Sequence, residues 1–365
     1  MSENGQGVGL LGAKSDRTVQ VALVVIASVL ACAALSVAST VFAPLALALL
    51  IMAILWPLQK GLQSFLPKPL ALAVTIIILS LGFAAFGSLI VWSFSRVGQA
   101  VANDADRFQA AYEQLSVWLE GHGIAVAGIW AEHVNIGWYI RLAQTVIARL
   151  NSTTTFWLVV LVYVSLGLLE VDDFARNIKR MRNADLSQAL ISGSIATAQK
   201  MRSYYLVRTQ MSIVTGLLVY GITYAVGLPL AKEWGVLAFA LNYIPFLGPL
   251  LATLFATVYA IAEFQSWETA VLIFVLLNVI QVAIGSYVEP RVSGTALSMS
   301  PTLVLFSVFF WSYLWGVFGA FIGVPITIAI LTFCEQGPST RWLADLFGGA
   351  GPSRSNEELQ TRTNL

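Results

Sequence analysis

The spacing of charged residues restricts the fold of this chain more than any other feature of its sequence. No Asp, Glu, Lys or Arg lies between Arg291 and Glu335, a run of 43 residues. As one α-helix, this run would be roughly 65 Å long at about 1.5 Å per residue, twice the bilayer core of about 30 Å. The run must therefore fold back or break. The candidate positions for the break are Gly316, Gly319, Gly323 and Pro325.

The composition assigns the chain to the membrane. Of its 365 residues, 58% are hydrophobic and 11% are charged, whereas a soluble domain carries about 45 to 50% apolar and roughly 25% charged residues. The 20 basic and 19 acidic side chains nearly cancel, so the broad positive field that binds nucleic acid is missing. Cys32, Cys334, His122 and His133 have no spacing typical of a disulfide framework or a metal site. We therefore expect no nucleic-acid partner, metal or cofactor.

Uncharged runs of about 17 to 25 residues predict the membrane-spanning helices. The first run is longer than the core of about 7 to 15 residues in a secretory signal, so we interpret it as a retained helix. The predicted regular spans are residues 18–38, 39–57, 70–95, 153–169, 209–231 and 269–288. Together with two broken segments, they predict an all-α, polytopic integral membrane protein with about eight membrane segments.

Basic residues set the expected topology, because cytoplasmic loops are enriched in Lys and Arg. Segment 170–208 contains seven of them and the longer segment 96–152 contains four, so we expect the first inside and the second outside. The resulting order is a cytoplasmic tail at 1–17, three membrane helices at 18–95, a periplasmic helical module at 96–152, a membrane helix at 153–169, a basic cytoplasmic amphipathic helix at 170–208, a transport core at 209–334 and a cytoplasmic tail at 335–365. Alternatively, the basic helix lies on anionic membrane lipid.

Two segments, 234–262 and 301–333, cannot be ordinary membrane helices. The first is uncharged, but its middle, Asn242 to Pro249, contains two prolines and a glycine that disrupt a helix. Lipid cannot satisfy broken backbone, so such segments must be buried in protein or line a watery cavity. Paired interrupted segments mark the solute site of secondary transporters. We therefore favour transport over the alternative, in which the breaks serve close helix packing through Gly319-x-x-x-Gly323.

The two broken segments can cross the membrane or re-enter it. We favour two re-entrant hairpins, 234–262 entering from outside and 301–333 from the cytoplasm, over two broken spans. The hairpin arrangement places Arg291 inside and leaves Glu263 and Glu268 outside, which the positive-inside rule prefers.

Several ordered motifs occupy the second half of the chain. They are Asn242-Tyr-Ile-Pro-Phe-Leu-Gly-Pro249, Asn278 and Gln281, Glu289-Pro-Arg-Val-Ser-Gly294, Ser300-Pro301 and Trp315-Gly-Val-Phe-Gly-Ala-Phe-Ile-Gly-Val-Pro325. Their order and spacing over roughly residues 200–335, and the layout of the chain from residue 18 onward, resemble the autoinducer-2 exporter family of bacterial transporters.

The resemblance implies a multi-pass protein of the bacterial inner membrane with about eight membrane segments. Some relatives export the furanone signal autoinducer-2, and others are similar to alkali cation/proton antiporters. Many members have His where this chain has Ser300, so a proton-handling role at that position is not carried over.

We predict that solute contacts gather where the two broken segments approach span 269–288. Broken helices expose backbone groups, glycines allow close approach, and amide and phenol groups can bind a small polar solute. The predicted substrate-binding residues are Asn242, Tyr243, Pro245, Gly248, Pro249, Asn278, Gln281, Gly316 and Gly319. The candidates for handling a coupling ion are Glu289 and Arg291, which we expect to pair with each other.

This pattern favours a secondary transporter that exports a small polar metabolite or signalling molecule of the autoinducer-2 type. It is compatible with a homo-oligomer. An alkali cation/proton antiporter is the alternative, although it needs a buried carboxylate and Glu263, Glu268 and Glu289 all lie at segment ends. A membrane scaffold or receptor subunit without transport is a further alternative, which the paired breaks disfavour. We expect no enzyme, because the spans contain no Ser/His or paired-Asp constellation and no HExxH motif.

Overall fold

The structure is a computed structural model, and it describes residues 7–110, 120–121, 154–293, 299–337 and 340–348. Its elements are α1 (Gly7–Val37), α2 (Ser39–Gln63), α3 (Lys68–Asn103), α6 (Thr154–Lys179), α7 (Ala184–Ala225), α8 (Ala231–Leu241), α9 (Leu247–Phe264), α10 (Trp267–Val282), the π-helix η1 (Ala283–Val288), α11 (Glu289–Ser293), α12 (Pro301–Gln336) and α13 (Arg341–Phe347). Within these ranges, eight helices are long and apolar enough to cross a membrane, and no strand is present. The prediction of an all-α polytopic membrane protein is confirmed.

Short polar side chains mark where several helices begin. Asn183, Ser266 and Ser300 each accept a hydrogen bond from the backbone N–H three residues later, at the first turns of α7, α10 and α12. These caps satisfy donors that have no partner inside the helix. In α12, Pro301 follows the cap at the position where a missing N–H costs least.

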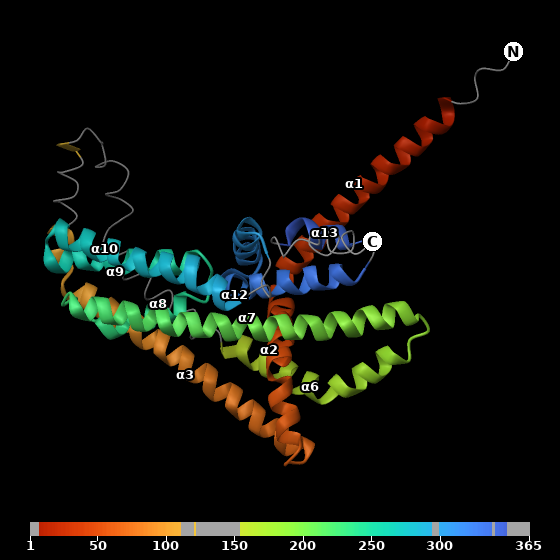
Figure 1. The fold of residues 1–365 in the computed structure, drawn as a ribbon, viewed down its shortest axis with the longest axis horizontal. Helices are drawn as coiled ribbons and strands as arrows, with labels where there is room; N and C mark the ends of the chain where they lie inside the picture. The colour runs from red at the N-terminus through yellow and green to blue at the C-terminus, as the bar shows by residue number, and fades with distance from the viewer. Residues whose placement is uncertain (1–6, 111–119, 122–153, 294–298, 338–339, 349–365) are drawn as a thin grey trace, which may run out of the picture.

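Helix α1 projects away from the rest of the molecule (Figure 1). It is joined to α2 through the single residue Ala38, and its contacts are with α2 and α12. The indole N–H of Trp315 donates to the carbonyl oxygen of Leu35 at 3.0 Å, close to the end of α1. The earlier apolar side chains, such as Val24 and Leu30, are more than half exposed, as expected for a helix that faces lipid.

Helix α7 runs without interruption for 42 residues. The sequence suggested a basic helix at 170–208 followed by a separate span at 209–231, whereas the structure shows one helix across that boundary and the loop to α8 already at residue 226. No proline lies in α7, so nothing breaks the backbone where the charged residues stop. A change in polarity marks a membrane boundary, but it does not require a helix end.

Segment 234–262 folds into a helical hairpin, hereafter the first hairpin, made of α8 and α9. The rings of Trp234 in α8 and Tyr259 in α9 lie 5.4 Å apart, so the two arms run back along each other. Phe246 has a positive φ of 63° at the turn. A side chain at Gly248 would collide with the carbonyl oxygen of Leu241, which explains the glycine directly after the turn.

Segment 301–333 also folds back on itself, within α12, and forms the second hairpin. Gly316 breaks the helix with φ 64° and ψ −143°. Across the break, the indole N–H of Trp311 donates to Thr327 Oγ1 at 3.3 Å, and a Cβ at Gly323 would lie 2.9 Å from the carbonyl oxygen of Ser307. The predicted hairpin geometry is therefore present in both broken segments, while the side from which each enters the membrane stays a prediction.

Ion pairs lie at the base of each of the two hairpins. At one end, Arg96 and Arg107 of the α3 region pair with Glu233 and Glu263 at 3.4 and 3.5 Å, next to the start of α8 and the end of α9. At the other end, Lys200 of α7 pairs with Glu335 of α12 at 2.8 Å. The two hairpins therefore begin at opposite ends of the molecule and extend toward each other.

Parts of the expected domain order fall outside the described residues. These parts are most of the 96–152 module with His122 and His133, the first six residues of the chain, and the tail beyond residue 348. The placement of every polar segment inside or outside the membrane remains a prediction from its charges.

Candidate functional site

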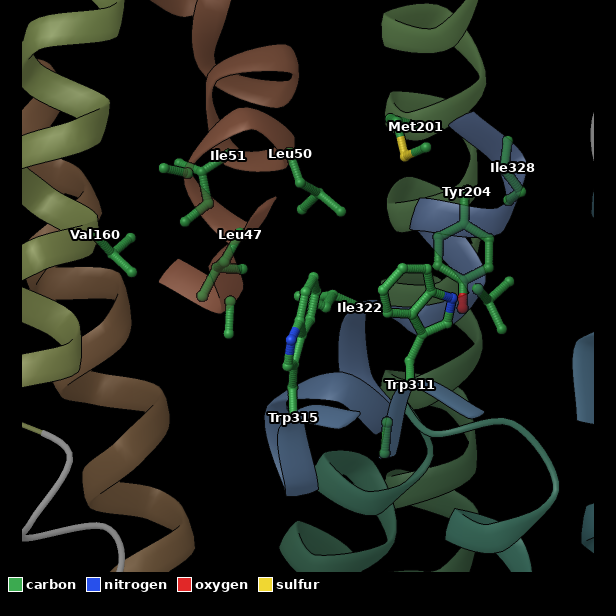
Figure 2. Close-up of a cluster of buried hydrophobic side chains, with 14 of the residues drawn as sticks. Leu47, Leu50, Ile51, Val160, Met201, Tyr204, Trp311, Trp315, Ile322 and Ile328 are labelled. Atoms are coloured by element: carbon green, nitrogen blue, oxygen red, sulfur yellow. The ribbon is translucent and has the colours of Figure 1, made fainter. Parts of the chain in front are cut away.

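The tips of the two hairpins meet beside α7. Ile244 at the tip of the first hairpin belongs to the same buried cluster as Trp311 and Trp315 of the second hairpin and Tyr204 of α7. Figure 2 shows Tyr204 next to Trp311 and, further along, Trp315 facing α2. The rings of Tyr243 and Phe321 also stack across the junction at 6.5 Å. Two breaks that lie far apart in the sequence thus face a single helix.

Hydrogen bonds hold the first hairpin tip to α7. The amide of Asn242 donates to Ser212 Oγ at 3.2 Å, and Tyr243 Oη donates to Thr209 Oγ1 at 3.0 Å. Asn242 and Ser212 are both buried. A broken segment in lipid needs protein partners of this kind, because no water is present to replace them.

An ion pair between a buried arginine and a half-buried glutamate joins α7 to the end of the α10 span. Arg208 Nη1 lies 2.7 Å from Glu289 Oε1, and the side chains are 6% and 25% exposed. Glu289 directly follows η1, and π-helical turns are frequent at functional sites. The expected pairing of Glu289 with Arg291 is wrong, because residues two apart on a helix point in different directions and Arg291 is exposed.

Several polar atoms on this face of α7 are shielded from solvent and have no hydrogen-bond partner among the described residues. They are Tyr204 Oη, Arg208 Nε and Thr215 Oγ1. Leaving a buried polar group without a partner costs about 1–3 kcal/mol. These three groups lie on one face of one helix, and another molecule or ordered water can supply their missing bonds.

The predicted site residues divide into two sets. The first hairpin tip contains Asn242, Tyr243, the buried Pro245 and Gly248, and the half-buried Pro249. The second tip contains the exposed Gly316, and Gly319 is buried just behind it. Asn278 and Gln281 lie on α10, which packs against α9 and α7 and has no extensive contact with α12 in the described structure. The amide of Asn278 donates to Phe274 of its own helix at 2.8 Å.

The polar face of α7 was missed by reasoning from the sequence. Its buried members Tyr204, Arg208, Ser212 and Thr215 follow one another at steps of four, four and three residues, which places them on one side of a helix. That spacing is readable in the sequence. The spacing is overlooked if Arg208 is assigned to the cytoplasmic segment and the membrane span is taken to begin at Thr209.

Replacing Asn242 by leucine is expected to destabilise the protein by about 1–3 kcal/mol, because Ser212 Oγ would be left buried without its amide partner. The matched change Asn278→Leu removes an amide that bonds only to its own helix and should change stability by less than about 0.5 kcal/mol. Thermal unfolding of the detergent-purified variants compares the two. Equal losses of stability would contradict the role given to the Asn242–Ser212 bond.

An all-α bundle with two opposed, broken helical hairpins and a polar face between their tips defines a membrane transporter. A model of the AI-2E family transporter matches residues 22–339, so the chain belongs to this family. It is 27% identical over 303 residues, 82% of this chain and 87% of the relative, to "AI-2 transport protein TqsA" of Escherichia coli K12. It is 24% identical over 307 residues, 81% of this chain and 83% of the relative, to "Putative transport protein YhhT" of the same strain. The predicted family and multi-pass inner-membrane location are thereby confirmed.

Proposed function

We propose that this transporter exports a small, polar, uncharged metabolite of the autoinducer-2 type along α7, between the tips of the two hairpins. The observation that carries the proposal is the meeting of both breaks at the polar face of α7. The printed name of the Escherichia coli relative, an AI-2 transport protein, supports the choice of solute class. In this proposal the protein moves its solute unchanged and performs no chemical reaction on it.

The environment of the acidic residues argues against alkali cation/proton antiport. A carboxylate that exchanges a proton for a cation must be free of a basic partner, but Glu289 pairs with Arg208 and Glu263 lies 3.5 Å from Arg107. A scaffold without a solute path is disfavoured, because paired broken segments are typical of the solute site in secondary transporters.

Flux into proteoliposomes tests the proposal. We expect the protein to move a radiolabelled dihydroxyfuranone and to leave ²²Na⁺ uptake at the level of empty liposomes under an imposed proton gradient. Sodium flux without furanone flux would favour the antiporter instead.

Leucine at position 278 or 281 is expected to abolish furanone flux while membrane insertion is unchanged, if Asn278 and Gln281 supply hydrogen bonds to the moving solute. Flux in proteoliposomes measures the effect, with protein content per vesicle as the control for insertion. Normal transport by both variants would restrict the path to the face of α7 and the hairpin tips.

A further inference from the structure

We propose that Arg208 and Tyr204 form a subsite that binds an oxygen atom of a neutral solute, which rests on the transport path proposed along α7. Both residues are 5% exposed. They are four residues apart in α7, so their side chains lie one above the other on the same face. Arg208 and Tyr204 lie outside the hairpin motifs, so those motifs assign them no role in binding.

Two donors on this face of α7 have no acceptor among the described residues. Arg208 Nη1 donates to Glu289. The Nε–H of Arg208 and the hydroxyl of Tyr204 have no hydrogen-bond partner among the described residues. Glu289 holds the guanidinium in place from one side, so the free edge of Arg208 is fixed before any ligand arrives. Preorganised donors of this kind bind a ligand oxygen without the cost of ordering flexible side chains.

These donors lie near the junction of the two hairpins. Tyr204 lies next to Trp311 (Figure 2), in the buried cluster that also contains Trp315 of the second hairpin and Ile244 of the first hairpin tip. Tyr243 at the first tip bonds to Thr209, the residue directly after Arg208. A solute held by Tyr204 and Arg208 would therefore contact α7 and lie beside both breaks.

The chemistry of the donors selects the class of ligand. A guanidinium has N–H donors and no acceptor, so it cannot coordinate an alkali cation. Its positive charge is balanced by Glu289 at 2.7 Å, so the subsite has no net charge left to attract a phosphate or another dianion. The ligand that fits is a neutral compound that presents a hydroxyl or carbonyl oxygen, with the indole rings of Trp311 and Trp315 offering apolar surface beside it.

Tyr204→Phe gives the sharpest test, because it removes only an oxygen that has no partner. As a purely structural residue, Tyr204 should lose nothing by this change, and the unliganded protein should be as stable as the wild type or more stable. If Tyr204 Oη binds the solute, the variant should bind it about five- to tenfold more weakly, the effect of one lost hydrogen bond. Tyr224→Phe is the matched control on the same helix, since Tyr224 is 71% exposed.

Binding is measured as stabilisation of the purified full chain against thermal unfolding. The probes are a dihydroxyfuranone, a pentitol, inorganic phosphate and sodium chloride. We expect at least one of the two neutral probes to stabilise the wild type and Tyr224→Phe, and phosphate and sodium to have no specific effect. Arg208→Lys keeps the charge opposite Glu289 but lacks Nε, and should weaken binding of the same probe roughly tenfold or more.

The proposal is overturned if neither neutral probe stabilises the wild type, if only phosphate does, or if Tyr204→Phe binds as tightly as the wild type. This readout does not depend on transport. A furanone that binds at Tyr204 but is not carried across proteoliposomes would contradict the proposed function and leave the subsite standing, and the reverse result would contradict the subsite alone.

Discussion

Alanine at position 319 is expected to unfold the second hairpin and to abolish transport. A Cβ at Gly319 would fall on the carbonyl oxygen of Trp311 in the opposite arm. Because the opposing atom belongs to the backbone, it cannot rotate away as a side chain could. Overpacking costs typically 1–3 kcal/mol, and we expect a loss of about 3 kcal/mol or more here, since the two arms must separate.

Gly82→Ala is the matched control for this prediction. Gly82 lies in α3, and a Cβ added there would meet no atom within 4 Å, so alanine should stabilise the helix by about 0.5–1 kcal/mol. Thermal unfolding in detergent and flux in proteoliposomes report on both variants. A Gly319→Ala protein that is as stable and as active as Gly82→Ala would show that the arms of the second hairpin do not pack as closely as described.

Removing Glu289 is expected to have the second largest effect. In Glu289→Leu, the buried guanidinium of Arg208 would lose its only carboxylate partner among the described residues. Leaving a buried charge without its partner typically costs about 3–5 kcal/mol, and the 25% exposure of Glu289 places the expected loss at the lower end of this range. Glu268→Leu is the control, because Glu268 is an exposed residue in the first turn of α10 and its loss should cost less than about 1 kcal/mol.

The double variant Arg208→Met/Glu289→Leu separates stability from function. An apolar pair of similar volume removes both charges, and such replacements are often neutral or stabilising. We therefore expect thermal stability to return close to that of the wild type while furanone flux stays absent, because the donors on α7 are gone. A double variant that transports normally would mean that the ion pair serves folding alone.

The two hairpins could be predicted from the sequence, and the ion pair could not. Pro245 and Gly316 interrupt uncharged runs that are too long or too irregular for one membrane helix, and this local chemistry already requires a break or a fold-back in each run. The partner of Glu289 lies 81 positions away in the chain. Proximity in sequence favoured Arg291, but two residues apart on a helix do not face each other.

The continuous helix α7 shows a second limit of the sequence. The positive-inside rule locates charges relative to the membrane, but it says nothing about where a helix stops. The rule therefore assigns Arg208 to a polar segment, although it is one of the most buried charged side chains described. The periodicity of Tyr204, Arg208 and Ser212 carried the missing information.

Cross-linking the two hairpin tips tests most directly whether solute passes between them. Tyr243 and Phe321, whose rings stack at 6.5 Å, would be replaced by cysteines in a chain whose Cys32 and Cys334 are changed to alanine. Tyr220 and Tyr224, whose rings lie 5.9 Å apart within α7, provide a control pair for the same short, reducible thiol cross-linker. We expect the furanone flux that the unlinked double-cysteine protein retains to stop when the tips are linked and to return on reduction, and the control link to leave flux unchanged. Undiminished flux through protein whose hairpin tips are fully cross-linked would contradict the account.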